Sequence, residues 1–132
     1  MPSADDLAAV PLFQTLSDGE REEAASWFSD KTVEAGSHLI GQGAPGYLFF
    51  VLIDGTAAVS QGTSTIAELG PGDFFGEIAI LGSRRRSAGV TTTSRARLLV
   101  MFGSEFRRLQ DAHPEIAARI EEAMRQRLSS PM

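Results

Sequence analysis

Between Lys31 and Phe102 the chain alternates short β-rich segments with glycine and proline breakers, and this spacing limits the folds open to it. The breakers include Asp54-Gly55 and Gly70-Pro71-Gly72-Asp73. Strand signals that recur about every eight to twelve residues are typical of an antiparallel sandwich or jelly roll, whereas βαβ units place a helix between strands. The predicted strands are Thr32–Ala35, His38–Gly41, Tyr47–Ile53, Thr56–Gln61, Thr65–Leu69, Ser87–Thr93 and Arg97–Phe102.

The segment before the predicted strands is expected to be helical. Ser17 and Glu20 have the spacing of a capping box, in which each side chain accepts a hydrogen bond from the other residue's backbone N–H. This box predicts a helix over Glu20–Phe28. Leu7–Phe13 predicts a shorter helical turn, and residues 1–6 are expected to be a frayed terminus.

The segment after the strands predicts two more helices. Ser104 is expected to cap the first, and Pro114 to occupy the first turn of the second, which extends to Leu128. Glu121 and Arg125 are spaced for an i,i+4 ion pair on the second helix. An apolar stripe on this helix, available for the β-roll or for a second copy of the chain, consists of Ile116, Ile120, Met124 and Leu128.

Length and charge restrict the class of protein. The 132 residues suffice for one domain with a modest core. A net charge of −5 supplies no general cationic field for nucleic acid or anionic membranes. The lack of cysteine excludes disulfides and thiolate metal sites. The longest apolar run, Tyr47–Ile53, is far shorter than a membrane span, and no signal peptide is evident, so a cytoplasmic protein is expected.

Catalytic and metal chemistry find little support. Gly41–Gly46 matches G-x-G-x-x-G, but a strand-like segment follows where dinucleotide binding needs a helix, so we expect a plain connecting loop. His38 and His113 are the only histidines and lack metal-ligand spacing, so no metal site is predicted. Because there is also no G-x-S-x-G motif and no nucleophile with an evident histidine partner, we do not expect an enzyme.

Glu77 is unusual because it lies in the otherwise apolar segment Phe74–Leu81. A short helical turn beginning near Gly76 would offer free backbone N–H groups to an anion, and glycine would let a ligand approach the backbone closely. A carboxylate at the edge of a dry pocket needs hydrogen-bond donors, because an unpaired buried charge is costly. Ligand hydroxyls could be those donors.

Three consecutive arginines, Arg84–Arg86, follow this segment. If Ser87–Thr93 is a strand, alternation places Arg86 on the inward face that Ala88 and Val90 share. No helix-turn-helix pattern accompanies the arginines, so they do not predict direct nucleic-acid binding. From the residues alone two interpretations remain open. Either the segment binds a small anion with hydroxyls, a sugar phosphate or nucleotide, or the carboxylate and arginine form a structural salt bridge.

The same stretch resembles the phosphate-binding cassette of cyclic nucleotide-binding domains, the family of the catabolite activator protein, the regulatory subunits of protein kinase A and cyclic nucleotide-gated channels. The family pattern is F-G-E, an aliphatic residue, A, more aliphatic residues, a variable loop, and R-x-A. This chain has Phe75-Gly76-Glu77-Ile78-Ala79-Ile80-Leu81, the loop Gly82–Arg85, and Arg86-Ser87-Ala88-Gly89-Val90. Further matches are Pro11-Leu12-Phe13 with Leu16, Ala35-Gly36, Gln42-Gly43, Asp54-Gly55 and Pro71-Gly72-Asp73-Phe74.

The resemblance implies a mainly β fold, an antiparallel eight-stranded β jelly roll with N-terminal helices and two C-terminal helices. One domain would cover residues 1–132, with helices over 7–28, the β-roll over 31–102 and C-terminal helices over 104–128. The implied ligand-binding residues are Phe75, Gly76, Glu77, Ile78, Ala79, Arg86, Ser87 and Ala88.

The implied roles follow the family pattern. Glu77 would accept a hydrogen bond from the ribose 2′-hydroxyl, and Arg86 would pair with the exocyclic oxygens of the cyclic phosphate. The backbone N–H groups of Gly76, Ile78, Ala79 and Ala88, with the Ser87 hydroxyl, would complete the cradle. The chain departs from the pattern at Arg85, where proline is usual, and at Gly89, where threonine is usual. Neither change removes a ligand-contacting side chain, so binding is expected to persist.

The implied function is that of a cyclic AMP receptor, with cyclic GMP as the other candidate ligand and with no cofactor. Binding would reposition the C-terminal helices and signal to an effector domain, a partner protein or a second copy that pairs through the last helix. The alternative is a degenerate interaction module that keeps the fold and no longer binds nucleotide.

Overall fold

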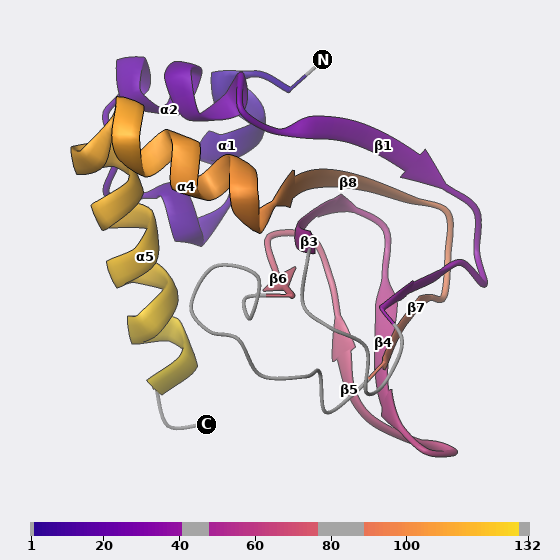
Figure 1. The fold of residues 1–132 in the computed structure, drawn as a ribbon. Coiled ribbons are helices and arrows are strands. Elements are labelled where there is room, and N and C mark those ends of the chain that lie inside the picture. The colour runs from indigo at the N-terminus through magenta and orange to yellow at the C-terminus, as the bar shows by residue number, and fades with distance from the viewer. Residues whose placement is uncertain (1, 41–47, 77–88, 130–132) are drawn as a thin grey trace.

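The computed structural model describes residues 2–40, 48–76 and 89–129, in which the helices gather on one side of a β-roll (Figure 1). The helices are α1 (Ala4–Ala8), the 3-10 turn η1 (Pro11–Phe13), α2 (Asp18–Ala25), α4 (Gly103–Ala112) and α5 (Pro114–Ser129). The strands are β1 (Ser29–Val33), β2 (His38–Ile40), β3 (Leu48–Asp54), β4 (Ala57–Gln61), β5 (Ser64–Leu69), β6 (Phe74–Phe75), β7 (Gly89–Thr92) and β8 (Ala96–Phe102).

The strands form two four-stranded sheets of antiparallel pairs. The first sheet has the order β1-β8-β3-β6 and the second the order β2-β7-β4-β5. Consecutive strands such as β6 and β7 therefore lie in different sheets, as in a jelly roll. The predicted fold class, an eight-stranded jelly roll with flanking helices, is confirmed.

The central strands of the first sheet, β8 and β3, are buried on both faces because they lie between the helices and the second sheet. Along β3, Phe49 and Val51 pack in a core with the helices, whereas Phe50 and Leu52 pack in a second core inside the roll. Strand β8 alternates in the same way. A strand that is covered on both sides needs a continuous apolar run, which explains the uninterrupted Tyr47–Ile53 segment of the sequence.

The N-terminal helices are capped by their own side chains. The predicted box is present in α2, since Ser17 N–H donates to Glu20 Oε1 at 2.9 Å and Glu20 N–H donates to Ser17 Oγ at 3.2 Å. The expectation that residues 1–6 fray is wrong for Ala4–Asp6, which belong to α1. A second capping box starts that helix, in which Ser3 N–H donates to Asp6 Oδ2 at 3.0 Å and Asp6 N–H donates to Ser3 Oγ at 3.3 Å.

The cap of α4 also differs from the prediction. Phe102, and not Ser104, is the N-cap residue, and its backbone N–H donates to Glu105 Oε1 at 2.8 Å. Strand β8 runs directly into this helix, so the cap lies on the last strand residue. Pro114 occupies the first turn of α5 as predicted. No helix in the described ranges is long and apolar enough to cross a membrane.

A tight turn between β3 and β4 is confirmed at Asp54-Gly55. Gly55 has φ 93°, a conformation that glycine adopts without steric cost, and its N–H donates to Asp54 Oδ1 at 2.9 Å. A Cβ at Gly55 would lie 2.4 Å from the Arg95 carbonyl oxygen and 2.8 Å from Ala96 Cα. The turn therefore excludes larger residues both by its φ and by the close approach of a neighbouring backbone.

Candidate functional site

The predicted ligand-binding residues are only partly within the described structure. Phe75 and Gly76 are described, at the end of β6. The loop positions Arg84 and Arg85 lie outside the described residues. So do the other predicted ligand residues, which are Glu77, Ile78, Ala79, Arg86, Ser87 and Ala88. The roles assigned to them stay predictions. The Gly41–Gly46 loop also lies outside the described ranges, but the element that follows it is strand β3, so the helix that dinucleotide binding requires is absent there.

Strand β6 fixes the point at which the cassette begins. Phe75 pairs with Phe50 of β3, and their rings stack with centroids 4.9 Å apart and an interplanar angle of 13°. Phe74 points the other way, toward the helix-side core, where its ring centroid lies 5.9 Å from that of Phe49. One short strand is thus anchored in both cores, which holds the backbone ahead of the cassette in place.

The turn that precedes β6 is bonded to β3. Gly72 N–H donates to the Leu52 carbonyl and Leu52 N–H donates to the Asp73 carbonyl, both at 2.8 Å. The Asp73 carboxylate also accepts the Gly70 N–H at 2.8 Å. After β6, Gly76 is buried and has φ 80°, a region that larger residues adopt only with strain. The backbone conformation just before Glu77 therefore favours glycine.

Strand β7 fixes the point at which the cassette ends. Val90 and Thr92 are buried while Gly89 and Thr91 are half-buried, so the alternation predicted for this strand holds over its described residues. Thr92 is the single buried polar residue among those described, and its hydroxyl is satisfied. It donates to the Glu34 carbonyl at 2.8 Å and accepts from the Ser37 N–H at 2.9 Å.

The segment 77–88 starts from the first sheet and ends in the second, because β6 and β7 belong to different sheets. The described interior beside these strands is apolar and includes Leu52, Ala57, Val90 and the partly buried Val59. Among the described side chains no acidic and histidine residues group as a metal site, and no buried polar atom lacks a partner. The described residues thus supply an apolar wall and two fixed backbone ends, while the predicted charges, Glu77 and Arg86, belong to the segment between those ends.

The C-terminal helices pack on the N-terminal ones. The predicted apolar stripe is present through Ile116, Ile120 and Met124, all buried in the core that includes Leu12 and Phe13 of the η1 turn. This part of the stripe therefore docks on the helical layer and is not exposed for a second copy of the chain in this conformation. The Leu128 side chain lies outside the described ones.

Polar contacts also tie the same helices together at their surfaces. His113, between α4 and α5, has Nε2 3.2 Å from Glu23 Oε2 of α2, and Arg119 of α5 pairs with Glu20 of α2. The pKa of Glu20 is lowered below its usual range, mainly because its carboxylate accepts the Ser17 backbone N–H. The nearby Arg119 lowers this pKa as well. The C-terminal helices are thereby held to the N-terminal helix by both charge and apolar contact.

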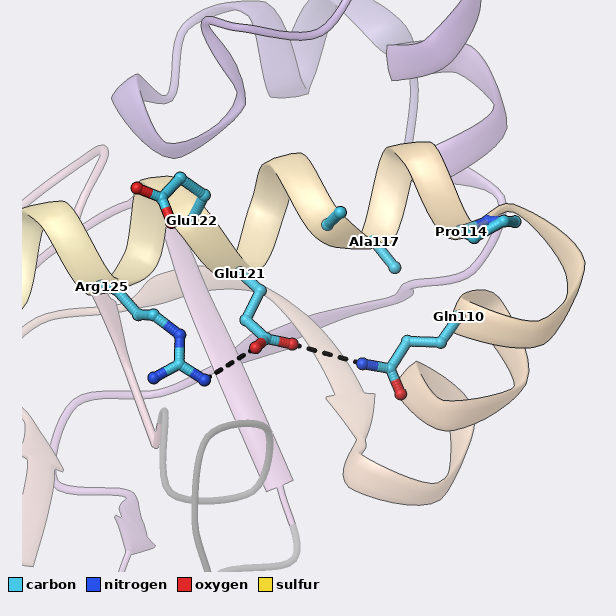
Figure 2. Close-up of a pocket in the computed structure, with 7 residues that line it drawn as sticks. Gln110, Pro114, Ala117, Glu121, Glu122 and Arg125 are labelled. Carbon is cyan, nitrogen blue, oxygen red and sulfur yellow. Dashed lines mark hydrogen bonds and ion pairs between the residues drawn. The ribbon is translucent and has the colours of Figure 1, made fainter.

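A groove lies between α4 and α5, with a volume of about 300 Å³ (Figure 2). The predicted pair is present there, since Arg125 donates to Glu121 Oε2 at 2.7 Å, and Gln110 Nε2 donates to Glu121 Oε1 at 3.2 Å. Glu122 and Pro114 also line it. Its ion pair lies within α5, the Gln110–Glu121 hydrogen bond connects the two helices there, and the sequence-predicted ligand residues do not line it.

An arginine clamp that sequence reasoning missed joins α1, β1 and β8. The Arg97 guanidinium donates to Asp6 Oδ1 at 2.9 Å and Oδ2 at 3.0 Å, and to Asp30 Oδ1 at 3.1 Å and Oδ2 at 2.7 Å. These bonds lower the pKa of Asp6 and of Asp30 and raise the pKa of Arg97. The partners lie far apart in sequence, so no local pattern signals the clamp.

Known proteins resemble this chain in sequence and structure. The family model described as cyclic nucleotide-binding domain matches residues 30–113. A cyclic nucleotide-gated potassium channel of Mesorhizobium japonicum is 38% identical over 111 residues, which cover 84% of this chain and 31% of the channel. A cAMP-dependent protein kinase regulatory subunit of Eremothecium gossypii is 35% identical over 106 residues, 80% of this chain and 23% of that protein. The chain thus spans less than a third of the length of these relatives.

Among solved structures, the N-terminal domain of a transcriptional regulator from Streptomyces coelicolor A3(2) superposes with a TM-score of 0.82 and 26% identity. The match covers 94% of this chain and 92% of that one. The likeness therefore extends over the helices as well as the β-roll.

Proposed function

This chain belongs to the cyclic nucleotide-binding domain family, and from that premise we propose that it is a receptor for a cyclic nucleotide. Cyclic AMP is the favoured ligand, and cyclic GMP is the other candidate. The observation that carries the proposal is that fixed strands precede and follow segment 77–88. The strands on either side of it are fixed in different sheets, and Gly76 occupies a buried positive-φ position just before Glu77.

The proposed contacts use the residues that match the family pattern. Arg86 pairs with the cyclic phosphate, because a planar guanidinium can make two charge-assisted bonds to one phosphate group. Glu77 accepts the ribose 2′-hydroxyl, which meets the need of a carboxylate beside a dry wall for a donor. The backbone N–H groups of Gly76, Ile78, Ala79 and Ala88 and the hydroxyl of Ser87 complete the phosphate cradle. Phe75 supports it through its stack on Phe50.

The apolar interior beside β7 supports this assignment. A phosphate and a carboxylate next to Val59 and Val90 are poorly screened by water, so their bonds to fixed donors are stronger than on the surface. No covalent step is involved: the chain binds and releases its ligand unchanged. It is a regulatory module and not a catalyst. The names of the channel and kinase-subunit relatives support a cyclic nucleotide as the ligand class.

The proposed output is carried by the C-terminal helices. They follow β8 directly and are bound to α2 through Glu23, Glu20 and the buried stripe. A ligand can shift their position only if it binds one arrangement more tightly than the other. An effector domain or a partner protein would then sense the helical layer.

Calorimetric titration of the unaltered chain and of three arginine variants tests the proposal. We expect saturable binding of cyclic AMP, and a loss for Arg86→Ala of roughly tenfold or more, since a charge-assisted bond contributes about 1.5–3 kcal/mol. Arg84→Ala and Arg85→Ala are matched controls that remove the same charge and are expected to bind within a few fold of the unaltered chain.

The possible outcomes test the receptor function and the role of Arg86 separately. No heat with either cyclic AMP or cyclic GMP would refute the receptor function. Binding by Arg86→Ala that equals binding by the two controls would refute the phosphate role of Arg86 while leaving the receptor function in place.

A further inference from the structure

An apolar cleft opens where the edge strand β1 of the first sheet meets the edge strand β2 of the second. Its lining comes from β1, β2, β3, β8 and the first turn of α4, and its volume is about 270 Å³. The walls include Leu39 and Leu48, both half-buried, and Phe102, which is 51% exposed. Phe102 and Ile66 are the only large apolar side chains in the described ranges that are this exposed, and Phe102 is the one that lies on a cleft.

This cleft is distinct from the proposed nucleotide site. None of its lining residues belongs to β6 or β7, the strands that frame segment 77–88. Phe50 forms part of its lining, and the ring of Phe50 stacks on Phe75, which does not line the cleft. The Phe50–Phe75 pair therefore stands between the cleft and the start of the cassette.

One polar group at the cleft, Lys31, can pair with an anion. Lys31 is exposed on β1 and makes no ion pair with the described residues. His38 on β2 forms a hydrogen bond between its Nδ1 and Thr91 Oγ1 at 2.9 Å. Its Nε2 has no partner among the described residues. The one carboxylate in the lining, Glu105, accepts the Phe102 N–H at 2.8 Å and is thereby held at the start of α4. Within the described ranges the lining thus combines a lysine that has no ion pair with a wall of apolar side chains.

We propose that this cleft binds a small amphiphilic anion, a medium-chain carboxylate whose apolar body packs on Leu48, Phe50 and Phe102 and whose head pairs with Lys31. Small-molecule sites are typically apolar hollows of about 300–1,000 Å³ with a few polar groups that orient the ligand. The volume of this cleft is close to the lower end of that range, which suits a single short acyl chain. The site adds a second ligand class and does not depend on nucleotide binding.

Titration calorimetry of the full chain with decanoate, below its micelle-forming concentration, tests the proposal. We expect saturable binding that Val33→Trp weakens by roughly tenfold or more, because the indole would occupy the cleft that Val33 lines. Ile66→Trp is the matched control: it places the same ring on β5, at an exposed position outside the cleft, and should leave the affinity unchanged. Circular dichroism checks that both variants fold.

A charge test keeps the proposal open to refutation even if Val33→Trp does not fold. Lys31→Glu changes an exposed side chain and should weaken the binding of decanoate by about two- to fivefold, as expected for the loss of an exposed ion pair. The same variant should bind decyltrimethylammonium more tightly than the unaltered chain does. No saturable binding of decanoate, equal effects of Val33→Trp and Ile66→Trp, or equal affinity for decanoate and decyltrimethylammonium in the unaltered chain would each overturn the proposal.

Discussion

Replacing Arg97 by methionine should destabilise the fold far more than the same change at Arg95, two residues earlier in the chain. The Arg97 side chain is 31% exposed and its partners Asp6 and Asp30 are 18% and 20% exposed, so this clamp is largely shielded from water. The Arg95 pair with Glu34 spans 3.7 Å between side chains that are 73% and 81% exposed. The two variants remove the same charge from very different surroundings.

The magnitude follows from the shielding. Breaking a buried pair costs about 3–5 kcal/mol, whereas an exposed pair contributes about 0.2–1 kcal/mol. The clamp is partly buried, so Arg97→Met should lower the free energy of unfolding by about 2–4 kcal/mol. Arg95→Met should change it by about 0.5 kcal/mol or less. Methionine keeps most of the apolar length of the arginine side chain, so lost packing is a small part of the difference.

The same prediction has a pH dependence with a definite sign. Arg97 lowers the pKa of Asp6 and of Asp30, so the clamp stabilises the fold fully above the ordinary aspartate pKa and loses its effect as the carboxylates protonate in acid. The difference between the unaltered chain and Arg97→Met should therefore be largest at neutral pH and shrink below about pH 4.

Urea unfolding followed by the fluorescence of Trp27, the only tryptophan, measures these free energies. Equal losses for Arg97→Met and Arg95→Met would refute the assignment of the clamp. A difference between the unaltered chain and Arg97→Met that persists undiminished into acid would refute its electrostatic origin.

Three further predictions concern the turns and the helical layer. Gly55→Ala should lose about 3 kcal/mol or more in urea unfolding, since it combines a positive φ with a Cβ 2.4 Å from a carbonyl oxygen, whereas Gly36→Ala, with φ 85° and open space around its Cβ, should lose only about 1–2 kcal/mol. Met124→Ala removes a fully buried side chain and should cost about 2–5 kcal/mol by thermal or urea unfolding, against about 0.5 kcal/mol or less for Ile66→Ala at a 54% exposed position. Gly76→Ala should lower the free energy of unfolding in urea by about 1–2 kcal/mol, since it places a Cβ on a residue with φ 80°; an unchanged stability would contradict that conformation.

Short-range sequence patterns predicted most of the strands and helices. The alternation of apolar segments and breakers indicated most strands, and the Ser17–Glu20 spacing indicated the start of α2. Strand β6 was missed because two residues cannot show a period, and it exists only because Phe74 and Phe75 pack into different cores. Its existence depends on the sheets around it.

Long-range contacts were beyond sequence reasoning. Arg97 meets Asp6 and Asp30 across 91 and 67 residues of sequence, so no motif links them. The docking of Ile116 and Ile120 on the N-terminal helices, and not on the roll, likewise depends on which face of the first sheet the helices cover. For the site, the structure describes Phe75 at the end of β6 and Gly76 just after it, whereas the short helical turn expected to begin near Gly76 and the roles of the residues in 77–88 remain predictions.

The central claim is that a cyclic nucleotide binds between the ends of β6 and β7, and amide chemical-shift mapping by NMR tests it most directly. Titration with cyclic AMP should produce saturable shifts that are largest for the amides of segment 77–88 and of the residues that flank it, Gly76, Gly89 and Val90. The amides of Gln110 and Glu121, in the groove between α4 and α5, should report only the accompanying shift of the C-terminal helices and change less. Saturable shifts confined to that groove, or no saturable shifts at all, would contradict the account.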